Sequence, residues 1–436
     1  MFFCCIISLV KKSFCILLFL IVFLCTVSGE VVLTADSAAA MALEGNRMLK
    51  QQEITYIDKE RNSKSRWNVF LPEITASAGV GRGNEILKNS PDAAWNGKVN
   101  GAISLTLGTD IPHKMARIRE EYAAGNIDYE NAKRNLEVTV RQAFYELLIY
   151  QRDMELVKSN IEANKKRYDQ TDERYRGGLV PELDVLNASL ACTKLIPQYD
   201  SLSTEYERKL DQFKISLGID ASEKIVLDGN LDDFVPKEVD FDNIPPAFET
   251  PELRSLKASL NVAESSRKEL KGSSLMPEIT LGWNITPTWD DLSYTDDYTD
   301  KGGFSATILW HLDNLIPNSA GNLKIKQLSD VSEKLRLRIA EEEVDSVSQV
   351  ENLVRKIRQQ QESVKTLELT AQIAERSLKL TEEAYEYGTK DMLDLSDAQQ
   401  QMLEAEVDIL KEKFSILCSI LELEYKLNLS FGTLGR

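Results

Sequence analysis

The sequence has little cysteine or histidine with which to build a site. Four of its six cysteines lie in the first 29 residues, which leaves Cys192 and Cys418, and there are only two histidines in 436 residues. Two cysteines and two histidines are too few for a disulfide framework, and their positions fit no metal-ligand spacing. We therefore expect neither a metal nor a cofactor. The sequence also lacks a glycine-rich phosphate loop, a nucleophile elbow and a zinc-helix motif. It therefore predicts that the protein is not an enzyme.

The sequence has fewer basic residues than acidic ones. Lys and Arg number 52 against 69 Asp and Glu, for a formal net charge of −17 at pH 7. Such a chain is repelled by phosphate backbones, so we expect no nucleic-acid partner. The remaining composition, 43% hydrophobic and 28% charged, is typical of a folded protein with a sizeable core.

Long apolar runs are also rare, and the main one lies near the N-terminus. Lys11 and Lys12 precede the run SFCILLFLIVFLCTV, and the small residues Ser28 and Gly29 follow it. This order is that of a secretory signal peptide, which we place at residues 1–29. Lipidation of Cys25 is an alternative for this segment, although the residue before it, Leu24, is not small.

A long internal repeat organises the rest of the chain. LPEIT at residues 71–75 returns as MPEIT at 276–280, and the pair Ile111-Pro112 returns as Ile316-Pro317. The segment TDERYRGGLVPELDVLNAS returns 210 residues later as TEEAYEYGTKDMLDLSDAQ. Three landmarks in one order indicate an internal duplication. We predict a first repeat over 30–240 and a second over 241–436.

Each repeat contains two segments with the alternating pattern of a β-hairpin. Apolar residues recur at every second position, which predicts strands near 72–81, 99–108, 277–286 and 302–311. The connector between the last two strands is acidic. Its aspartates fit no calcium-loop spacing, so we interpret it as a solvated loop.

The other segments predict unusually long helices. Glycine and proline are absent from 126–176, from 322–387 and from 389–430. Apolar residues there alternate in steps of three and four, which predicts coiled-coil seams. Pro197, inside a further helical segment, predicts a kink. A single-chain helical bundle is the alternative, but it leaves the amphipathic hairpins without a role.

Four strands are too few to close a barrel, and open strand edges cannot lie in lipid. If the hairpins enter a membrane, several chains must share one barrel, and three chains would give twelve strands. Four prolines lie where strand geometry must change to helix geometry, which suits a residue with a fixed φ angle. These predicted helix–strand joints are Pro72, Pro112, Pro277 and Pro317.

The chain resembles the TolC-like outer membrane efflux proteins over nearly its whole length. The resemblance rests on the Tyr-x-x-Gly-(x)4-Leu-Asp-(x)3-Ala turns at 175–188 and 385–398, on the Leu-Pro and Met-Pro strand entries, and on LSFGTL at 429–434. It implies a mainly α, internally duplicated chain whose long coiled-coil helices form a trimeric α-barrel joined to a 12-stranded β-barrel, with four strands from each protomer.

The resemblance also implies a function and partners. A homotrimer in the outer membrane lipid of a Gram-negative-type bacterium would be the exit duct of a tripartite efflux pump or a type I secretion system. A periplasmic adaptor and an inner-membrane pump of the RND or ABC type would complete the path. The alternative is a periplasmic coiled-coil structural or adaptor protein without a pore, in which the hairpins form a small β domain.

The helical turns are the candidate functional sites. Gly178 and Gly388 lie where a left-handed helix cap is expected, and the resemblance implies that these turns are tunnel tips that dock the adaptor. The predicted docking residues are Tyr175, Gly178, Leu179, Gly388 and Thr389.

Two carboxylates of the second turn, Asp394 and Asp397, are three residues apart and so project from one helix face. By spacing alone they could simply favour the helix dipole. The resemblance instead implies that they line the periplasmic aperture as a cation-selective ring. It further implies a gating network of Asp184, Tyr385 and Lys390, although Asp184 could be an ordinary helix-start carboxylate.

Overall fold

The computed structural model describes residues 31–82, 95–229, 234, 239, 241, 244–245, 247–293 and 296–434. The predicted signal peptide lies outside these residues. The chain forms two compact units, each built from three segments: 1–46, 136–237 and 359–418 in one, and 47–135, 238–358 and 419–436 in the other. We call them the tip unit and the sheet unit. Both units take segments from both sequence repeats, so the repeat boundary at 240 stays a prediction.

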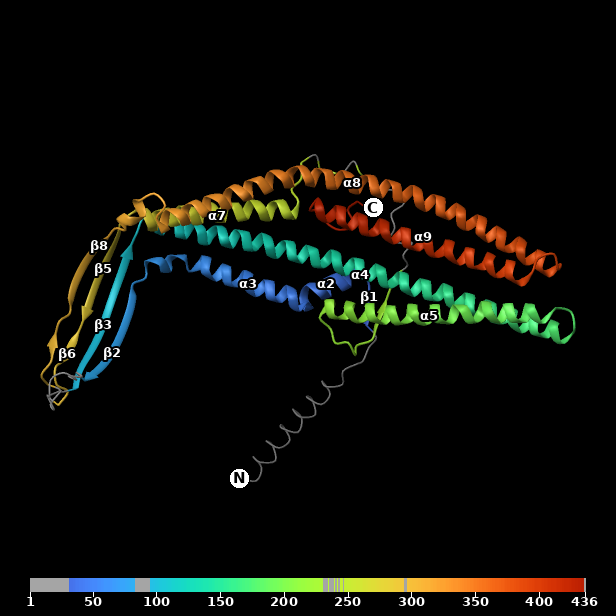
Figure 1. Cartoon of the computed structure of the whole chain (residues 1–436), viewed down its shortest axis with the longest axis horizontal. Helices are drawn as coiled ribbons and strands as arrows, with labels where there is room; N and C mark the ends of the chain where they lie inside the picture. The colour runs from blue at the N-terminus through green and yellow to red at the C-terminus, as the bar shows by residue number, and fades with distance from the viewer. Residues whose placement is uncertain are drawn as a thin grey trace, which may run out of the picture. The chain divides into compact units, whose positions relative to one another are not determined.

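The sheet unit contains the predicted hairpins as one antiparallel sheet (Figure 1). Strand β2 (Glu73–Arg82) pairs with β3 (Trp95–Leu107), β3 with β5 (Glu278–Ile285), and β5 with β8 (Gly303–Leu309). Two short strands, β6 (Pro287–Trp289) and β7 (Thr299–Asp300), add a small hairpin that the sequence analysis did not predict.

Two of the four prolines lie directly before strands, and the other two lie near the starts of the long helices that follow strands. Pro72 separates the 3-10 helix η1 (Arg66–Phe70) from β2, and Pro277 separates α7 (Pro251–Leu275) from β5. Pro112 is the second residue of α4 (Ile111–Arg176), and Pro317 follows the 3-10 helix η2 (Leu312–Leu315). The two Pro-Glu-Ile-Thr segments are therefore equivalent entries into strands, as the repeat predicted.

Long helices form most of the tip unit. Its core elements are the C-terminal part of α4, the whole of α5 (Glu182–Leu217), the C-terminal part of α8 (Ala320–Glu386) and most of α9 (Met392–Lys426). Helix α4 has 66 residues and α8 has 67, which confirms the prediction of unusually long helices. Seam residues from three helices meet in one core, where Val157 of α4 packs with Leu195 of α5 and Leu403 of α9.

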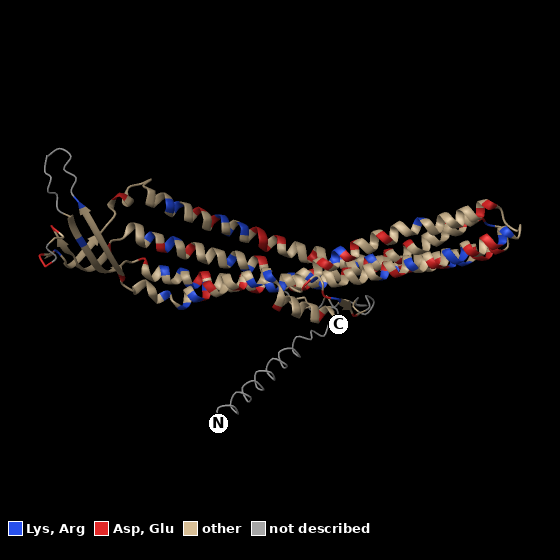
Figure 2. Cartoon of the chain, turned by 90° about the horizontal axis from the view of Figure 1, so that it is seen from below, with Lys and Arg blue, Asp and Glu red and all other residues tan. Residues whose placement is uncertain are grey.

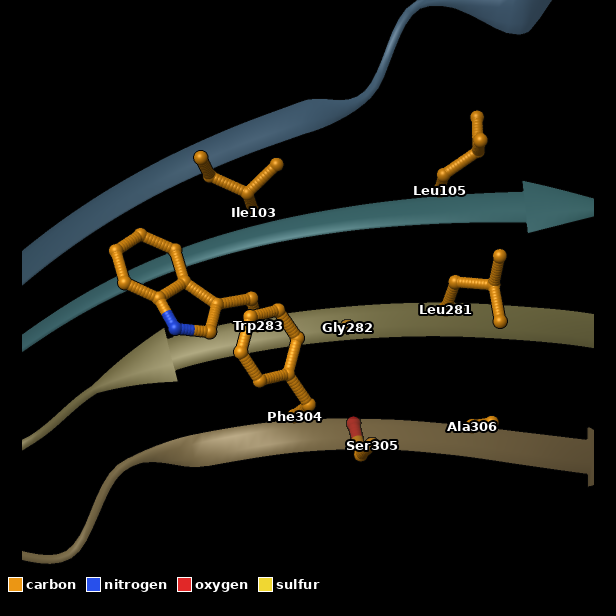
Figure 3. A pocket seen from close by; sticks show the side chains of 8 residues that line it. All are labelled: Ile103, Leu105, Leu281, Gly282, Trp283, Phe304, Ser305 and Ala306. Atoms are coloured by element: carbon orange, nitrogen blue, oxygen red, sulfur yellow. The ribbon is translucent and has the colours of Figure 1, made fainter.

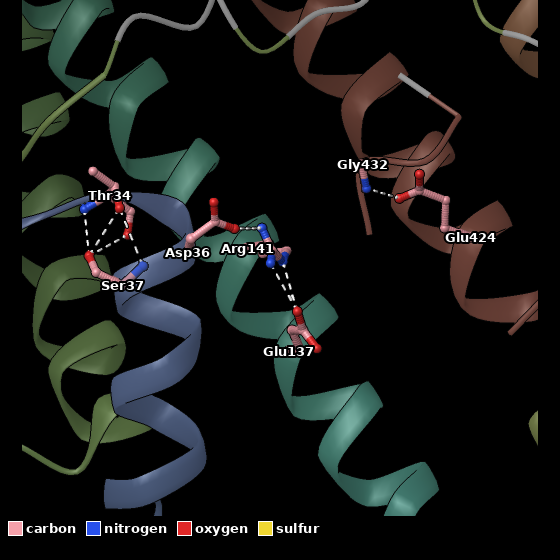
Figure 4. Close-up of polar contacts among 7 residues, drawn as sticks. All are labelled: Thr34, Asp36, Ser37, Glu137, Arg141, Glu424 and Gly432. Carbon is pink, nitrogen blue, oxygen red and sulfur yellow. Dashed lines mark hydrogen bonds and ion pairs between the residues drawn. The ribbon is translucent and has the colours of Figure 1, made fainter. Parts of the chain in front are cut away.

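The N-terminal segment of the tip unit is fixed by local hydrogen bonds. Strand β1 (Val31–Leu33) pairs in parallel with β4 (Ile225–Leu227), and helix α2 (Ala35–Gly45) follows. Thr34 and Ser37 form a reciprocal capping box at the start of α2 (Figure 4). Asp36 then pairs with Arg141 of α4 at 2.7 Å. Helix α3 (Arg47–Lys64) begins the sheet unit.

The end of the chain is fixed within the sheet unit by one fully buried carboxylate. Glu424 of α9 accepts hydrogen bonds from the backbone N–H groups of Gly432 at 3.0 Å and Leu434 at 2.9 Å (Figure 4). Arg134 donates to the carbonyl of Leu429 at 2.5 Å, so the LSFGTL segment has a defined place. Across the described residues, no helix combines the length and the apolar character needed to cross a bilayer.

Candidate functional site

The sheet has one apolar face. The register places Ile103 opposite Trp283, Leu105 opposite Leu281, and Trp283 opposite Phe304. Because side chains alternate across a strand, these residues and their neighbours two positions away share one side. Figure 3 shows six of them on that side, where they line a hollow of about 550 Å³: Ile103, Leu105, Leu281, Trp283, Phe304 and Ala306. Phe304 is 88% exposed, so this part of the face is open in the single chain.

The opposite face of the sheet is polar. Thr106 and Thr280 are hydrogen-bonded across the strands at 3.1 Å, and the Thr286 hydroxyl donates to Asn100 at 3.0 Å. Charged residues are dense along the helices but sparse on the strands (Figure 2). A sheet with one exposed apolar face and one polar face can separate lipid from an aqueous lumen.

Both long edges of this sheet are open. Within the part of the chain that the structure describes, β2 pairs only with β3, and β8 pairs only with β5. Their outer backbone N–H and C=O groups therefore have no strand partner. Open edges are sites for pairing with a further strand.

The two helical turns of the tip unit have the same geometry. Gly178 and Gly388 have φ angles of 71° and 70°, which confirms the predicted left-handed caps. Leu179 donates to the carbonyl of Arg174 at 2.9 Å, and Thr389 donates to that of Ala384 at 2.9 Å. Each turn is a Schellman motif. The predicted docking residue Leu179 is 77% exposed, so it is accessible in the single chain.

Residues from all four long helices pack into one cluster just behind these turns. Ala188 of α5 packs with Met392 and Leu395 of α9, and Tyr168 of α4 and Tyr385 of α8 complete the cluster. The predicted gate residue Tyr385 thus lies in this core, and its buried hydroxyl has no hydrogen-bond partner.

An ion pair that the sequence did not predict joins α4 and α8 close to this cluster. Arg167 pairs with Glu382, and the side chains are 20% and 41% exposed. Burial lowers the pKa of the Arg167 guanidinium, while the Glu382 carboxylate opposes that shift. A second nitrogen of Arg167, Nη1, is buried without a partner, so Glu382 is the main compensation for this charge.

Lys390, which the resemblance placed in a network with Asp184 and Tyr385, forms an ion pair with Asp394 instead. Its Nζ lies 3.0 Å from Oδ1 of Asp394. Within the described residues, no hydrogen bond or ion pair joins Asp184, Tyr385 and Lys390 in the single chain. The proposed gating network stays a prediction about the assembled protein. The i, i+4 spacing of Lys390 and Asp394 was a signal that could have predicted their contact.

The second predicted aperture residue, Asp397, lines a small polar cavity of about 50 Å³ between α4, α5 and α9. The amide oxygens of Asn164 and Gln399 line the same cavity and are buried without hydrogen-bond partners. Over the described ranges, no cluster of three or more His, Cys, Asp or Glu side chains could hold a metal ion.

Known proteins share this sequence pattern and this fold. The family model described as outer membrane efflux protein matches residues 39–194 and 249–424. The chain belongs to the outer membrane efflux protein family, which fits the resemblance of its repeated turns. The nodulation protein T of Rhizobium leguminosarum bv. trifolii is 24% identical over 271 residues, which is 58% of this chain and 54% of that protein. The match therefore spans about half the length of this curated relative.

Solved structures of outer membrane channels have the same fold. The structure of CusC has a TM-score of 0.74 at 11% identity, covering 91% of this chain and 92% of the other. The CmeC outer membrane channel of Campylobacter jejuni has a TM-score of 0.72 at 15% identity, covering 90% and 85%. These similarities confirm the predicted fold class of long helices with a β-sheet portion.

Proposed function

We propose that the chain forms the outer-membrane exit duct of a multi-component export system. Three copies close one barrel of twelve strands, and their long helices continue it as a tunnel in the periplasm. The helical tips form a gated entrance that docks a periplasmic adaptor, and an inner-membrane pump of the RND or ABC type drives transport. Family membership supports the export role, and the physical arguments below support the finer assignments.

The observation that carries this proposal is a two-faced sheet with two open edges. An exposed apolar face is unfavourable in water, and unpaired backbone groups are unfavourable in lipid. Pairing β2 of one copy with β8 of the next removes both problems, because it closes a barrel whose apolar face meets lipid and whose polar face lines a channel. A soluble coiled-coil protein, the alternative function, would have to cover this face in another way.

Exposed apolar residues on the helices support assembly with further copies. Leu337 and Val344 of α8, seven residues apart, are exposed in the sheet unit. Leu369 and Ile373 of the same helix are exposed in the tip unit. Spacings of four and seven residues belong to a helix-packing seam, and packing between protomers of a helical tunnel would bury these residues.

Two features at the tips support a gated entrance. Tyr385 has a buried hydroxyl that lacks a partner, and Arg167 has a buried nitrogen that lacks one. Buried polar groups without partners are unfavourable, so a rearrangement that gave them partners would be favoured. The Asp184 carboxylate, which forms no ion pair over the described residues, is available to supply such a contact in the assembled protein, whereas Lys390 is already paired with Asp394.

The test combines assembly with conduction. Light scattering in detergent should give the mass of three copies, and planar-bilayer recordings should give cation-selective channels. Asp394→Asn with Asp397→Asn should reduce both the cation preference and any block by calcium added at the tip side. A soluble monomer that never inserts into bilayers would refute the duct and favour the coiled-coil alternative.

Strand pairing between copies can be tested separately with paired cysteines on the two open edges. Ser77→Cys on β2 and Ser305→Cys on β8 lie on the same face but are separated by β3 and β5. Three strand spacings amount to about 14 Å, which is beyond disulfide reach within one chain. Oxidation should therefore link different copies. Scanning Thr75 and Thr307 covers other registers, each single variant is a control, and a complete failure to cross-link would contradict edge pairing.

A further inference from the structure

The first turns of α9 carry carboxylates in three different environments. Asp391 accepts a hydrogen bond from the backbone N–H of Asp394 at 2.9 Å. This is the pattern of an N-cap, in which a side chain satisfies a free N–H at the start of a helix. The charge of Asp391 is thus partly compensated by the positive end of the helix dipole.

Asp394 is compensated by a lysine of its own chain. Lys390 lies 3.0 Å from its carboxylate, and the two side chains are 50% and 42% exposed. The backbone N–H of Lys390 donates to the carbonyl of Ala384 at 3.3 Å. This hydrogen bond fixes the backbone of Lys390 relative to the end of α8. The ammonium is therefore held close to Asp394 by the turn itself.

Asp397 has no such compensation. Over the described part of the chain, its carboxylate makes no hydrogen bond and no ion pair. Lys194 lines the same cavity as Asp397 but forms no ion pair with it. The amide oxygens of Asn164 and Gln399, which also line this cavity, add further electronegative atoms. Of the two aperture carboxylates, Asp397 is therefore the one that is exposed and has no counter-ion over the described residues.

We propose that Lys390 is a tethered counter-ion that sets the charge of the entrance, so that Asp397 alone carries most of its cation preference. This inference rests on the proposed aperture. Each protomer would supply two ring carboxylates but only one uncompensated charge. A half-exposed ion pair contributes little to stability, but the potential at a narrow opening depends directly on its net charge.

The first repeat contains a natural contrast to this arrangement. The position equivalent to Lys390 is Val180, and the position equivalent to Asp397 is Asn187, while Asp184 matches Asp394. The first turn thus has neither the tethered cation nor the second carboxylate. The combination of lysine and two aspartates is confined to the second turn, which is where we place the control of selectivity.

The test measures the cation-to-anion permeability ratio and calcium block in planar bilayers. Lys390→Gln should raise the ratio severalfold and should tighten calcium block by a similar factor at 0.1 M salt. The gain should largely vanish near 1 M salt, where the screening length falls to about 3 Å. Lys390→Met should act like Lys390→Gln, and Lys390→Arg should behave as wild type, because only charge matters.

A charge-neutral double variant gives the sharpest comparison. Lys390→Gln with Asp394→Asn removes one positive and one negative charge, so its ratio should return close to wild type. Asp394→Asn and Asp397→Asn should each reduce the ratio by a similar amount, because either change leaves the positive charge of Lys390 with only one ring carboxylate at the turn. Lys365→Gln is the matched control, because Lys365 forms a similar pair with Glu362 at 2.8 Å in α8, 21 residues before that helix ends. It should leave selectivity unchanged.

Three results would overturn the counter-ion. In the first, Lys390→Gln and Lys390→Met both keep the wild-type permeability ratio, while Asp397→Asn lowers it. This result would remove the counter-ion role of Lys390 but would leave the proposed aperture standing. The second is a larger conductance with a lower cation preference in Lys390→Gln, which would make Lys390 a contact of the closed gate. If the Asp394→Asn, Asp397→Asn channel keeps the wild-type ratio, the aperture itself is wrong and the counter-ion falls with it.

Discussion

Gly178 and Gly388 have the same left-handed backbone, with φ angles of 71° and 70°, at equivalent positions of the two helical hairpins. A Cβ atom at either position would meet no atom within 4 Å, so space is not what requires glycine there. The requirement is the φ angle, which costs an L-residue with a Cβ atom roughly 1–2 kcal/mol.

We therefore expect Gly178→Ala and Gly388→Ala each to destabilise its own turn by about 1 kcal/mol. Hydrogen exchange of the Leu179 and Thr389 amides should become about fivefold faster, because opening of the turn becomes more frequent. Gly177→Ala is the control, since Gly177 does not have a left-handed backbone and its added Cβ would make only ordinary contacts. Equal acceleration by Gly177→Ala would contradict the backbone explanation.

The sequence predicted the elements of this fold because their signals are local. Alternation of period two marked the four long strands, and the repeated Pro-Glu-Ile-Thr marked where β2 and β5 begin. Helix α4 begins earlier than the glycine-free segment suggested, and it includes Gly125. A single glycine costs a helix only about 1 kcal/mol, which a 66-residue helix can absorb. Helix α5 likewise continues through Pro197.

The contacts of the candidate site were harder to predict because they join distant segments. Arg167 and Glu382 are 215 residues apart, and no periodicity relates them. The β6–β7 hairpin has strands of three and two residues, too short to show alternation. The tip turns were predictable because glycine has a specific role in a left-handed cap. The roles of Asp394, Asp397 and Lys390 depend on an assembly of several copies, which one sequence specifies only through resemblance.

The Arg167–Glu382 pair should have unequal effects when each partner is removed. Glu382→Gln leaves the more buried charge, Arg167, without compensation, whereas Arg167→Gln leaves a carboxylate that is 41% exposed to water. We expect Glu382→Gln to cost about 1–2 kcal/mol, less than the 3–5 kcal/mol of a fully buried pair. Arg167→Gln should cost less than Glu382→Gln. Thermal unfolding in detergent, followed by circular dichroism, would measure both.

The control for this pair is Arg152–Glu155, an exposed pair at 3.0 Å on α4. Glu155→Gln should change the free energy of unfolding by less than about 0.5 kcal/mol. If Arg167→Gln is the more damaging change, then packing of the long arginine side chain, rather than its charge, dominates at this position.

Neighbouring residues on β8 should respond in opposite ways to the same substitution. Ala306 is on the apolar face, opposite Leu281, and Thr307 is on the polar face, opposite Thr280. A lysine facing lipid costs roughly 2–4 kcal/mol near the middle of a bilayer. Ala306→Lys should therefore reduce assembly in the outer membrane strongly. Thr307→Lys should assemble normally and lower cation conductance, because its ammonium would project into the lumen.

Membrane fractionation and bilayer recordings would separate these two outcomes. Both substitutions replace a small side chain with lysine on the same edge strand, so differences in size or strand propensity are minimised. Equal tolerance of the two variants would argue against a lipid-facing side of the sheet. A defect in Thr307→Lys alone would mean that the two faces are assigned the wrong way round.

Asp153 should make the tip unit less stable at neutral pH than it is under mildly acidic conditions. Its Oδ1 atom is buried without a hydrogen-bond partner. Burial raises the pKa of the Asp153 carboxyl, and the charge of Lys411 opposes this shift only in part. The folded chain therefore binds the proton at a higher pH than the unfolded chain does. The resulting stabilisation is complete below the unfolded pKa and is lost as pH rises through the folded pKa.

Asp153→Asn removes this dependence, because an amide does not ionise. We expect the variant to unfold at a higher temperature than wild type at pH 7, with the difference shrinking as the pH falls toward the ordinary aspartate range near 4. Asp200→Asn, at an exposed position of α5, should follow the wild-type profile. A lower unfolding temperature for Asp153→Asn at pH 7 would show that attraction to Lys411 outweighs desolvation of the buried carboxylate.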